Sequence, residues 1–185
     1  MYYSVTFIVD GVERNTWDNW QMIPNTPPMI AAPEPNLDMV EIPGRSRGPL
    51  DMSGVAFGKM TYKRMTGTWT FYKEPETQDT RHTFYDAITS FFNGKIVKVI
   101  LTDEDPVHFY VGRFRVGTPS TSKGPMTIQL TYDLMPARWN VSDNTPDTSY
   151  GAEDVSTWVD PTVPPNPSVI IEWNAVSETV SVTYI

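Results

Sequence analysis

Apolar and polar side chains alternate with a period of two along much of the first 139 residues, and this pattern predicts β-strands with one buried face. The alternation begins at 3–9, where the dipeptide Asp10-Gly11 supplies a turn signal. Other segments rich in aromatic and β-branched residues lie at 57–72, 96–101, 107–116 and 126–134. The dipeptide Thr66-Gly67 interrupts the first of these, which predicts two antiparallel strands or one bulged strand there.

One segment has the period of a helix instead. Phe84, Ile88, Phe91 and Phe92 fall on one helical face, and Gly94 follows as a left-handed stop. A set of strands with a single amphipathic helix predicts a mainly β (α+β) fold. We expect a β-sandwich or split barrel with one packed α-helix.

Three regions follow one another along the chain. Residues 1–139 have the composition of a domain with a core, whereas 140–167 are rich in Pro, Asp, Ser and Thr and predict an acidic linker or arm. Residues 168–185 contain two short strand patterns, which predict a C-terminal β-hairpin extension. A hairpin of this size buries no core of its own, so we expect it to pack on another surface.

Composition narrows the classes of function. The 185 residues include no cysteine, which excludes disulfides, thiolate metal sites and cysteine nucleophiles. The net charge is −8, and every Lys and Arg lies at or before Arg138, so no basic stripe for binding nucleic acid is present. Neither a membrane span nor a basic N-terminal leader is found, and we expect no membrane partner.

The sequence contains none of the motifs for catalysis, phosphate binding or metal binding that were sought. The chain has neither a Gly-x-Ser-x-Gly elbow nor a glycine-rich phosphate loop. Its two histidines, His82 and His108, match no metal-ligand spacing, and the acidic run 103–105 is typical of a solvated turn. We therefore expect no catalytic residues, no metal, no cofactor and no enzymatic activity.

The order of four motifs is similar to that of a known family. They are a loop at 15–24 that leads into prolines, a Pro-Gly and Leu-Asp signature at 42–53, the helix end Phe-Phe-Asn-Gly-Lys at 91–95, and an Asp-Pro to Gly-Arg strand at 105–113. Together they resemble the N-terminal domain of siphophage distal tail proteins, the Dit-like family, over about three quarters of the chain. The resemblance implies a tail-tube-like fold.

The resemblance also implies a function. It predicts a structural subunit of a phage tail tip or baseplate, which forms a homohexameric ring with other copies of itself and joins the major tail tube protein to the tail-associated hub protein. The ring would continue the tube's lumen, through which the tape measure protein and then DNA pass in transit. Receptor-binding or other baseplate proteins are further expected partners. Such a protein belongs to the virion and is assembled in the host cytoplasm.

Several residues are candidates for the subunit interface. In the loop from Pro43 to Asp51, Arg45 and Arg47 are placed to reach a neighbour's carboxylates. The alternative is an ordinary surface turn, in which Gly44 takes a positive φ and Asp51 accepts hydrogen bonds from backbone donors.

Two further interface candidates lie outside that loop. Arg113 and Arg115 share one face of a predicted strand, where they form either contacts between subunits or ordinary cross-strand pairs. Trp158 lies in the acidic linker, where nothing local buries it, so we expect it to dock on another chain.

Two alternatives to the distal tail protein stay open. The chain could be another tail component, either a tail tube or a tail-completion protein. It could also be a carbohydrate-binding β-sandwich, because six tryptophans offer flat apolar rings for stacking on sugars.

Overall fold

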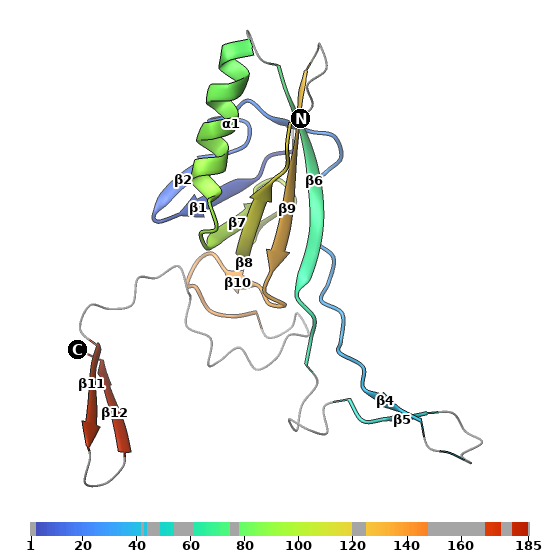
Figure 1. Cartoon of the computed structure of the whole chain (residues 1–185), viewed down its shortest axis with the longest axis vertical. Helices are drawn as coiled ribbons and strands as arrows, with labels where there is room; N and C mark the ends of the chain where they lie inside the picture. The colour runs from blue at the N-terminus through green and yellow to red at the C-terminus, as the bar shows by residue number, and fades with distance from the viewer. Residues whose placement is uncertain are drawn as a thin grey trace.

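The structure is a computed structural model, and it describes residues 3–41, 43, 49–53, 61–74, 78–119, 125–147, 169–174 and 179–184. Its centre is one antiparallel sheet of eight strands in the order β2-β1-β7-β8-β9-β6-β3, with β10 beside β8 (Figure 1). The strands are β1 (Thr6–Val9), β2 (Val12–Asn15), β3 (Ile23–Pro24), β6 (Met65–Lys73), β7 (Val97–Leu101), β8 (Asp105–Val116), β9 (Met126–Leu134) and β10 (Trp139–Asn140).

The helix α1 (Gln78–Phe92) packs on one face of this sheet. Ile88 and Phe92 are wholly buried, as the apolar period of the sequence predicts. Gly94 ends the helix with φ +71°, and the amide of Lys95 donates a 2.7 Å hydrogen bond to the carbonyl of Phe92. The expected position and C-terminal stop of the helix are therefore confirmed.

An aromatic cluster joins the helix to the sheet. The ring of Phe7, from β1, lies 5.1 Å from Phe92 of the helix and 5.1 Å from Phe114 of β8, both edge to face. Trp20 and Trp69 pack against the same cluster. Each such ring pair contributes about 1 kcal/mol beyond its burial. The predicted fold class, a mainly β sandwich or split barrel with one packed helix, is confirmed.

The opposite face of the sheet has a smaller core. Phe109 and Val111 of β8 are buried there with Trp139, whose ring stacks on Phe109 at 5.7 Å. Beyond Trp139 the chain continues to contact the sheet, since the amide of Val141 donates to the carbonyl of Val107 and the side chain of Asp147 holds Arg138. Packed structure thus extends eight residues past the predicted domain end at 139.

The break predicted at Thr66-Gly67 is wrong. Strand β6 pairs with β9 in continuous register from Met65 to Lys73. A Cβ atom at Gly67 would lie 2.3 Å from the hydroxyl oxygen of Tyr132, so glycine is present there because the tyrosine side chain crosses the strand. The glycine marks a close approach between two strands and not a break in one.

Two smaller sheets lie off the central one. Strand β4 (Met39–Val40) pairs with β5 (Leu50–Asp51), and β11 (Val169–Asn174) pairs with β12 (Thr179–Tyr184), both antiparallel. In the part of the chain that the structure describes, no helix has the length and hydropathy of a membrane span.

Candidate subunit interface

A two-stranded arm leaves the sheet at the Met65 end of β6 and projects away from the body (Figure 1). We define the arm as residues 34–41 together with 49–53 and 61–63. Its two sides are joined by backbone hydrogen bonds, from Lys63 to Glu34, from Asn36 to Thr61 and from Met52 to Asp38, each 2.8 Å long. The β4–β5 pair is the outermost described part of this ladder.

Both roots of the arm are fixed to the body. Arg64 donates hydrogen bonds to the carboxylate and to the carbonyl of Asp133 on β9, at 2.5 and 3.0 Å. On the other side, the indole of Trp69 donates a 3.0 Å hydrogen bond to the carbonyl of Met29. These contacts fix the direction in which the arm leaves the sheet.

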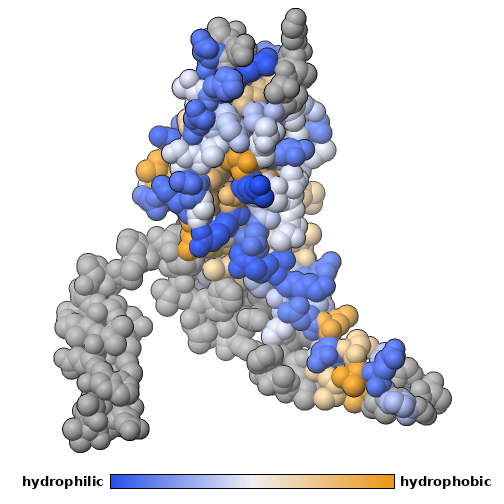
Figure 2. Space-filling view, in the orientation of Figure 1, coloured by the Kyte–Doolittle hydropathy of each residue, from blue (hydrophilic) through white to orange (hydrophobic). Residues whose placement is uncertain are grey.

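The arm carries exposed apolar side chains. Leu37 is 62% exposed and Met39 is 49% exposed, and the two lie two residues apart along the arm. Val40 is also exposed. Figure 2 shows apolar residues gathered on the arm between charged ones. A cluster of this kind on a projecting element is typical of a surface that binds another protein.

One predicted interface residue, Asp51, has a local role in the arm. Its carboxylate accepts a 2.9 Å hydrogen bond from the amide of Ser53, and hydrogen bonds from the Ser53 side chain and backbone lower the pKa of Asp51 below its ordinary value. The Ser53 hydroxyl in turn accepts from the amide of Asp38 across the arm. Asp51 therefore stabilises the turn, as one of the two interpretations of the sequence expected.

The other predicted interface residues are placed as follows. Pro43 is exposed in a turn beyond the end of β4, whereas Gly44, Arg45, Arg47 and Trp158 lie outside the described residues.

Arg113, the remaining candidate, is exposed on β8. Its guanidinium donates a hydrogen bond to the carbonyl of Gly94, just past the end of α1. Arg113 thus contacts the turn that follows the helix.

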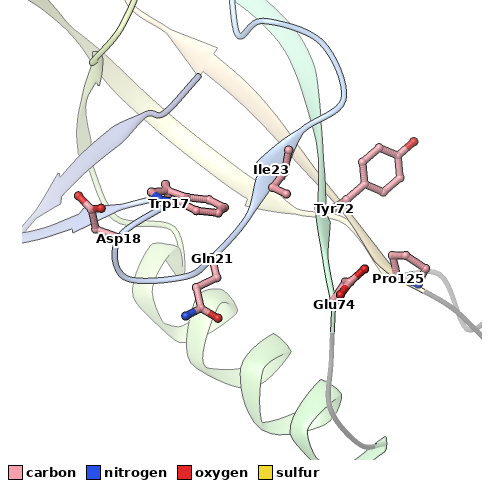
Figure 3. Close-up of a pocket in the computed structure, with 7 residues that line it drawn as sticks. All are labelled: Trp17, Asp18, Gln21, Ile23, Tyr72, Glu74 and Pro125. Carbon is pink, nitrogen blue, oxygen red and sulfur yellow. The ribbon is translucent and has the colours of Figure 1, made fainter. Parts of the chain in front are cut away.

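A pocket lies at the other end of β6, against the edge strand β3. We call it the edge pocket. Its volume is about 460 Å³, and it is lined by Trp17, Asp18, Gln21, Ile23, Tyr72, Glu74 and Pro125 (Figure 3). These residues come from the loop before β3, from β3 itself, from the end of β6 and from the start of β9. Its described lining combines two exposed aromatic rings with two carboxylates, and no basic side chain is among these seven residues.

The loop that carries one side of the edge pocket is held by its own hydrogen bonds. The Asn15 side chain accepts from the amides of Trp17 and Asp18, at 2.8 and 3.2 Å. The amide of Gln21 donates to the carbonyl of Trp17, and Gln21 has φ +53°, a left-handed conformation that is uncommon outside glycine. The pocket wall is therefore built by the fold before anything binds.

A cluster of charged side chains attaches residues 138–147 to the sheet. His108 lies between two carboxylates, with Nδ1 2.7 Å from Asp105 and Nε2 3.5 Å from Asp147, and Arg138 contacts the same two acids at 3.5 and 2.7 Å. Burial acts to lower the pKa of Arg138, but its hydrogen bonds with Asp147 and Tyr110 outweigh this and raise the pKa. This polar cluster ties residues 138–147 to β8.

In the polar cluster the imidazole of His108 lies between the two carboxylates, which it contacts through different nitrogen atoms. Among the described residues, no three ligands of the His, Asp and Glu type converge.

The comparisons with known proteins bear on the fold. No protein-family model matches the chain, and no curated protein matches it. Among solved structures, the chain is similar to the crystal structure of SPP1 Dit, a protein described as a paradigm of the hub adsorption apparatus in phages that infect Gram-positive bacteria. The TM-score is 0.53 and the sequence identity 13%. The fold is Dit-like.

The likeness extends over most of this chain. It covers 74% of this chain but 52% of the other, so the chain spans about half the length of the Dit protein that it resembles. The expectation of a Dit-like fold, drawn from four short sequence motifs, is confirmed at the level of the fold.

Sequence reasoning missed two parts of this surface. The arm has strands of only two residues, which are too short to show a period. The edge pocket joins segments more than 100 residues apart, from Trp17 to Pro125, and no local pattern connects them.

Proposed function

We propose that this chain is a non-enzymatic structural subunit of a phage tail tip, which closes into a hexameric ring between the tail tube and the tail hub. In this proposal the ring continues the lumen of the tube for the tape measure protein and DNA. The Dit-like fold supports the tail-tip assignment, since SPP1 Dit is described as part of a hub adsorption apparatus.

The observation that carries the ring is the projecting arm. Its Leu37 and Met39 are exposed and no described residue buries them, and its roots at Arg64 and Met29 fix the direction in which it points. Burying both side chains on a neighbour removes apolar surface from water, which stabilises the contact by about 2 kcal/mol for each side chain. An arm that reaches away from its own body finds that cover most directly on another copy.

Head-to-tail contact between identical subunits closes into a ring when the rotation between neighbours is a whole fraction of a turn. The sheet of this protein ends in two short edge strands, β2 and β3, whose outer backbone groups have no partner in the chain among the described residues. A closed ring covers the apolar arm of every subunit, whereas a linear assembly of subunits leaves the arm of one terminal subunit exposed. Closure therefore limits the assembly to a defined size.

The ring is tested by the mass of the assembly. Light scattering on the purified protein should give six times the chain mass of 21.0 kDa, and negative-stain images should show six-fold rings. The double variant Leu37→Ser, Met39→Ser should shift the protein to the monomer, because it removes the apolar surface of the arm. The matched control is Val141→Ser, since Val141 is comparably exposed but lies outside the arm, and it should keep the ring.

Two results would contradict the proposal. One is a monomer at high concentration that binds neither tail tube protein nor hub protein. The other is a ring of unchanged mass in the Leu37→Ser, Met39→Ser variant, which would show that the arm is not the contact.

A further inference from the structure

The edge pocket has the chemistry of a receptor for arginine. Trp17 and Tyr72 are each 38% exposed and present their rings to the pocket, and Asp18 and Glu74 supply carboxylates beside them. A guanidinium group pairs with carboxylates through its N–H donors and stacks on aromatic faces. Gln21 adds an amide to the same lining (Figure 3).

The chain itself contains a segment that matches this pocket. Between Pro43 and Pro49, the last described residues at the end of the arm, the sequence is Gly-Arg-Ser-Arg-Gly, with two arginines and no acid. We call residues 44–48 the arm tip. Its charge is opposite to that of the pocket lining, which holds two carboxylates and no base among the described residues.

One chain cannot bring these two surfaces together. The arm leaves from the Met65 end of β6, whereas Tyr72 and Glu74 of the pocket lie at the opposite end of that strand. Nine residues of strand span about 30 Å, and the arm with β4 and β5 extends further in the direction away from that end of β6 (Figure 1). The arm, from Glu34 to Pro43, is about as long, so its described end at Pro43 and Pro49 is within reach of a neighbouring subunit of domain size.

We propose that the edge pocket of each copy binds the arm tip of the adjacent copy, with Arg45 and Arg47 held by Asp18 and Glu74 and stacked on Trp17 and Tyr72. The proposal rests on the ring proposed above and names the contact that sets its head-to-tail direction. Tip and pocket are different surfaces at opposite ends of one subunit, so the contact is heterologous, the kind that generates rings. Burial of the apolar side chains of the arm stabilises the contact. The charged arm tip determines the surface of the neighbour to which the arm binds and the position in which it binds.

Disulfide trapping tests the contact directly, because the chain has no cysteine of its own. Two variants, Ser46→Cys and Gln21→Cys, are purified separately, mixed and oxidised mildly. The expected result is a covalent dimer that forms from the mixture and not from either variant alone. The matched control replaces Gln21→Cys by Glu13→Cys, an exposed position on β2 outside the pocket, and it should give no dimer. The double variant Ser46→Cys, Gln21→Cys should give a ladder of covalent species up to the hexamer.

Removal of charge tests the chemistry. The double variant Asp18→Asn, Glu74→Gln keeps the shape of the pocket, and it should weaken ring association about ten-fold, through the loss of two partly exposed ion pairs. Glu13→Gln, which also removes one exposed carboxylate, should leave association unchanged. Arg45→Ala, Arg47→Ala should weaken the ring to the same degree, and combining it with the pocket variant should add little further.

The outcomes separate this contact from the ring itself. The wild type could form a ring of six chains while the mixture of Ser46→Cys and Gln21→Cys gives no covalent dimer. This result would overturn the arm-tip contact and leave the proposed ring in place. A monomeric wild type would overturn the ring. A disulfide within one chain of the double variant would show that the tip folds back, and saccharide binding at the pocket of the intact ring would show that it is open to another ligand. Either result would also overturn the proposal.

Discussion

In the sheet body, Phe7, Phe71 and Leu130 are completely buried, whereas Leu37 and Met39 on the arm lie largely in solvent. Both regions are antiparallel strands joined by backbone hydrogen bonds. The body has packed layers, α1 on one face and residues 135–147 on the other, whereas no described residue forms such a layer on the arm. The difference teaches that the two sides of the arm pair with each other within one chain, but the burial of its side chains requires a second one.

The largest expected effect concerns the body. Phe7→Ala should lower the free energy of unfolding by about 4 kcal/mol, because the ring lies between Phe92, Phe114 and Trp20 and its removal leaves a cavity. Urea denaturation followed by tryptophan fluorescence measures this. Phe7→Leu keeps much of the volume and should lose about 1 kcal/mol. Equal losses in the two variants would contradict a core that depends on close packing at this point.

A smaller effect is expected where residues 138–147 meet the body. Asp147→Asn should lower the free energy of unfolding by about 1 to 2 kcal/mol, since Arg138 and His108 lose a partly buried charged partner. Hydrogen exchange should quicken at the amide of Asn140, which bonds to Thr145 in the same segment. Asp143→Asn is the control, because Asp143 is fully exposed and bonds only to Thr145 in its own turn. The comparison fails if both variants lose the same stability.

The arm should contribute little to the stability of the single chain. Leu37→Ser, Met39→Ser should change the free energy of unfolding of the dilute monomer by less than about 0.5 kcal/mol, because both side chains already lie in solvent. Calorimetry over a dilution series separates this from the loss of the ring. A loss above about 1 kcal/mol in the monomer would show that the arm packs on its own body.

The smallest effect is a titration within the arm. The carboxyl of Asp51 should titrate below its ordinary pKa, and Ser53→Ala should move the pKa up toward that value while the backbone hydrogen bond remains. Because the pKa is lowered in the folded state, the contribution of Asp51 is present above about pH 4 and is lost as the pH falls through the folded pKa. NMR titration of the side-chain carbonyl carbon measures both values. An unchanged pKa in Ser53→Ala would exclude the hydroxyl as the cause.

The body was largely predictable because its signals are local. A strand at 126–134 was expected, and β9 runs from Met126 to Leu134 with alternate residues buried. The apolar face of the helix and the stop at Gly94 lie within one short segment, where the period of a helix and the preference of glycine for positive φ act without distant residues. The Dit-like fold itself was inferred from the order of such segments.

Two features of the body were decided by tertiary structure alone. Gly67 suggested a break because a sequence pattern does not show the side chain of Tyr132 from β9 crossing that position. The polar cluster joins Asp105 and His108 to Asp147, about 40 residues away, and each residue alone has the pattern of an exposed polar position.

The positions of the arm and the edge pocket were also decided by tertiary structure. The amino-acid sequence by itself determined that the chain forms strands and an amphipathic helix, and it places two arginines between Pro43 and Pro49. Only the fold decided that Pro43 and Pro49 lie at the end of an arm that leaves one end of β6, and that Trp17, Asp18 and Glu74 meet at the other end. The physical reason is that periodicity is set by neighbours along the chain, whereas a surface is set by which distant segments the core brings together.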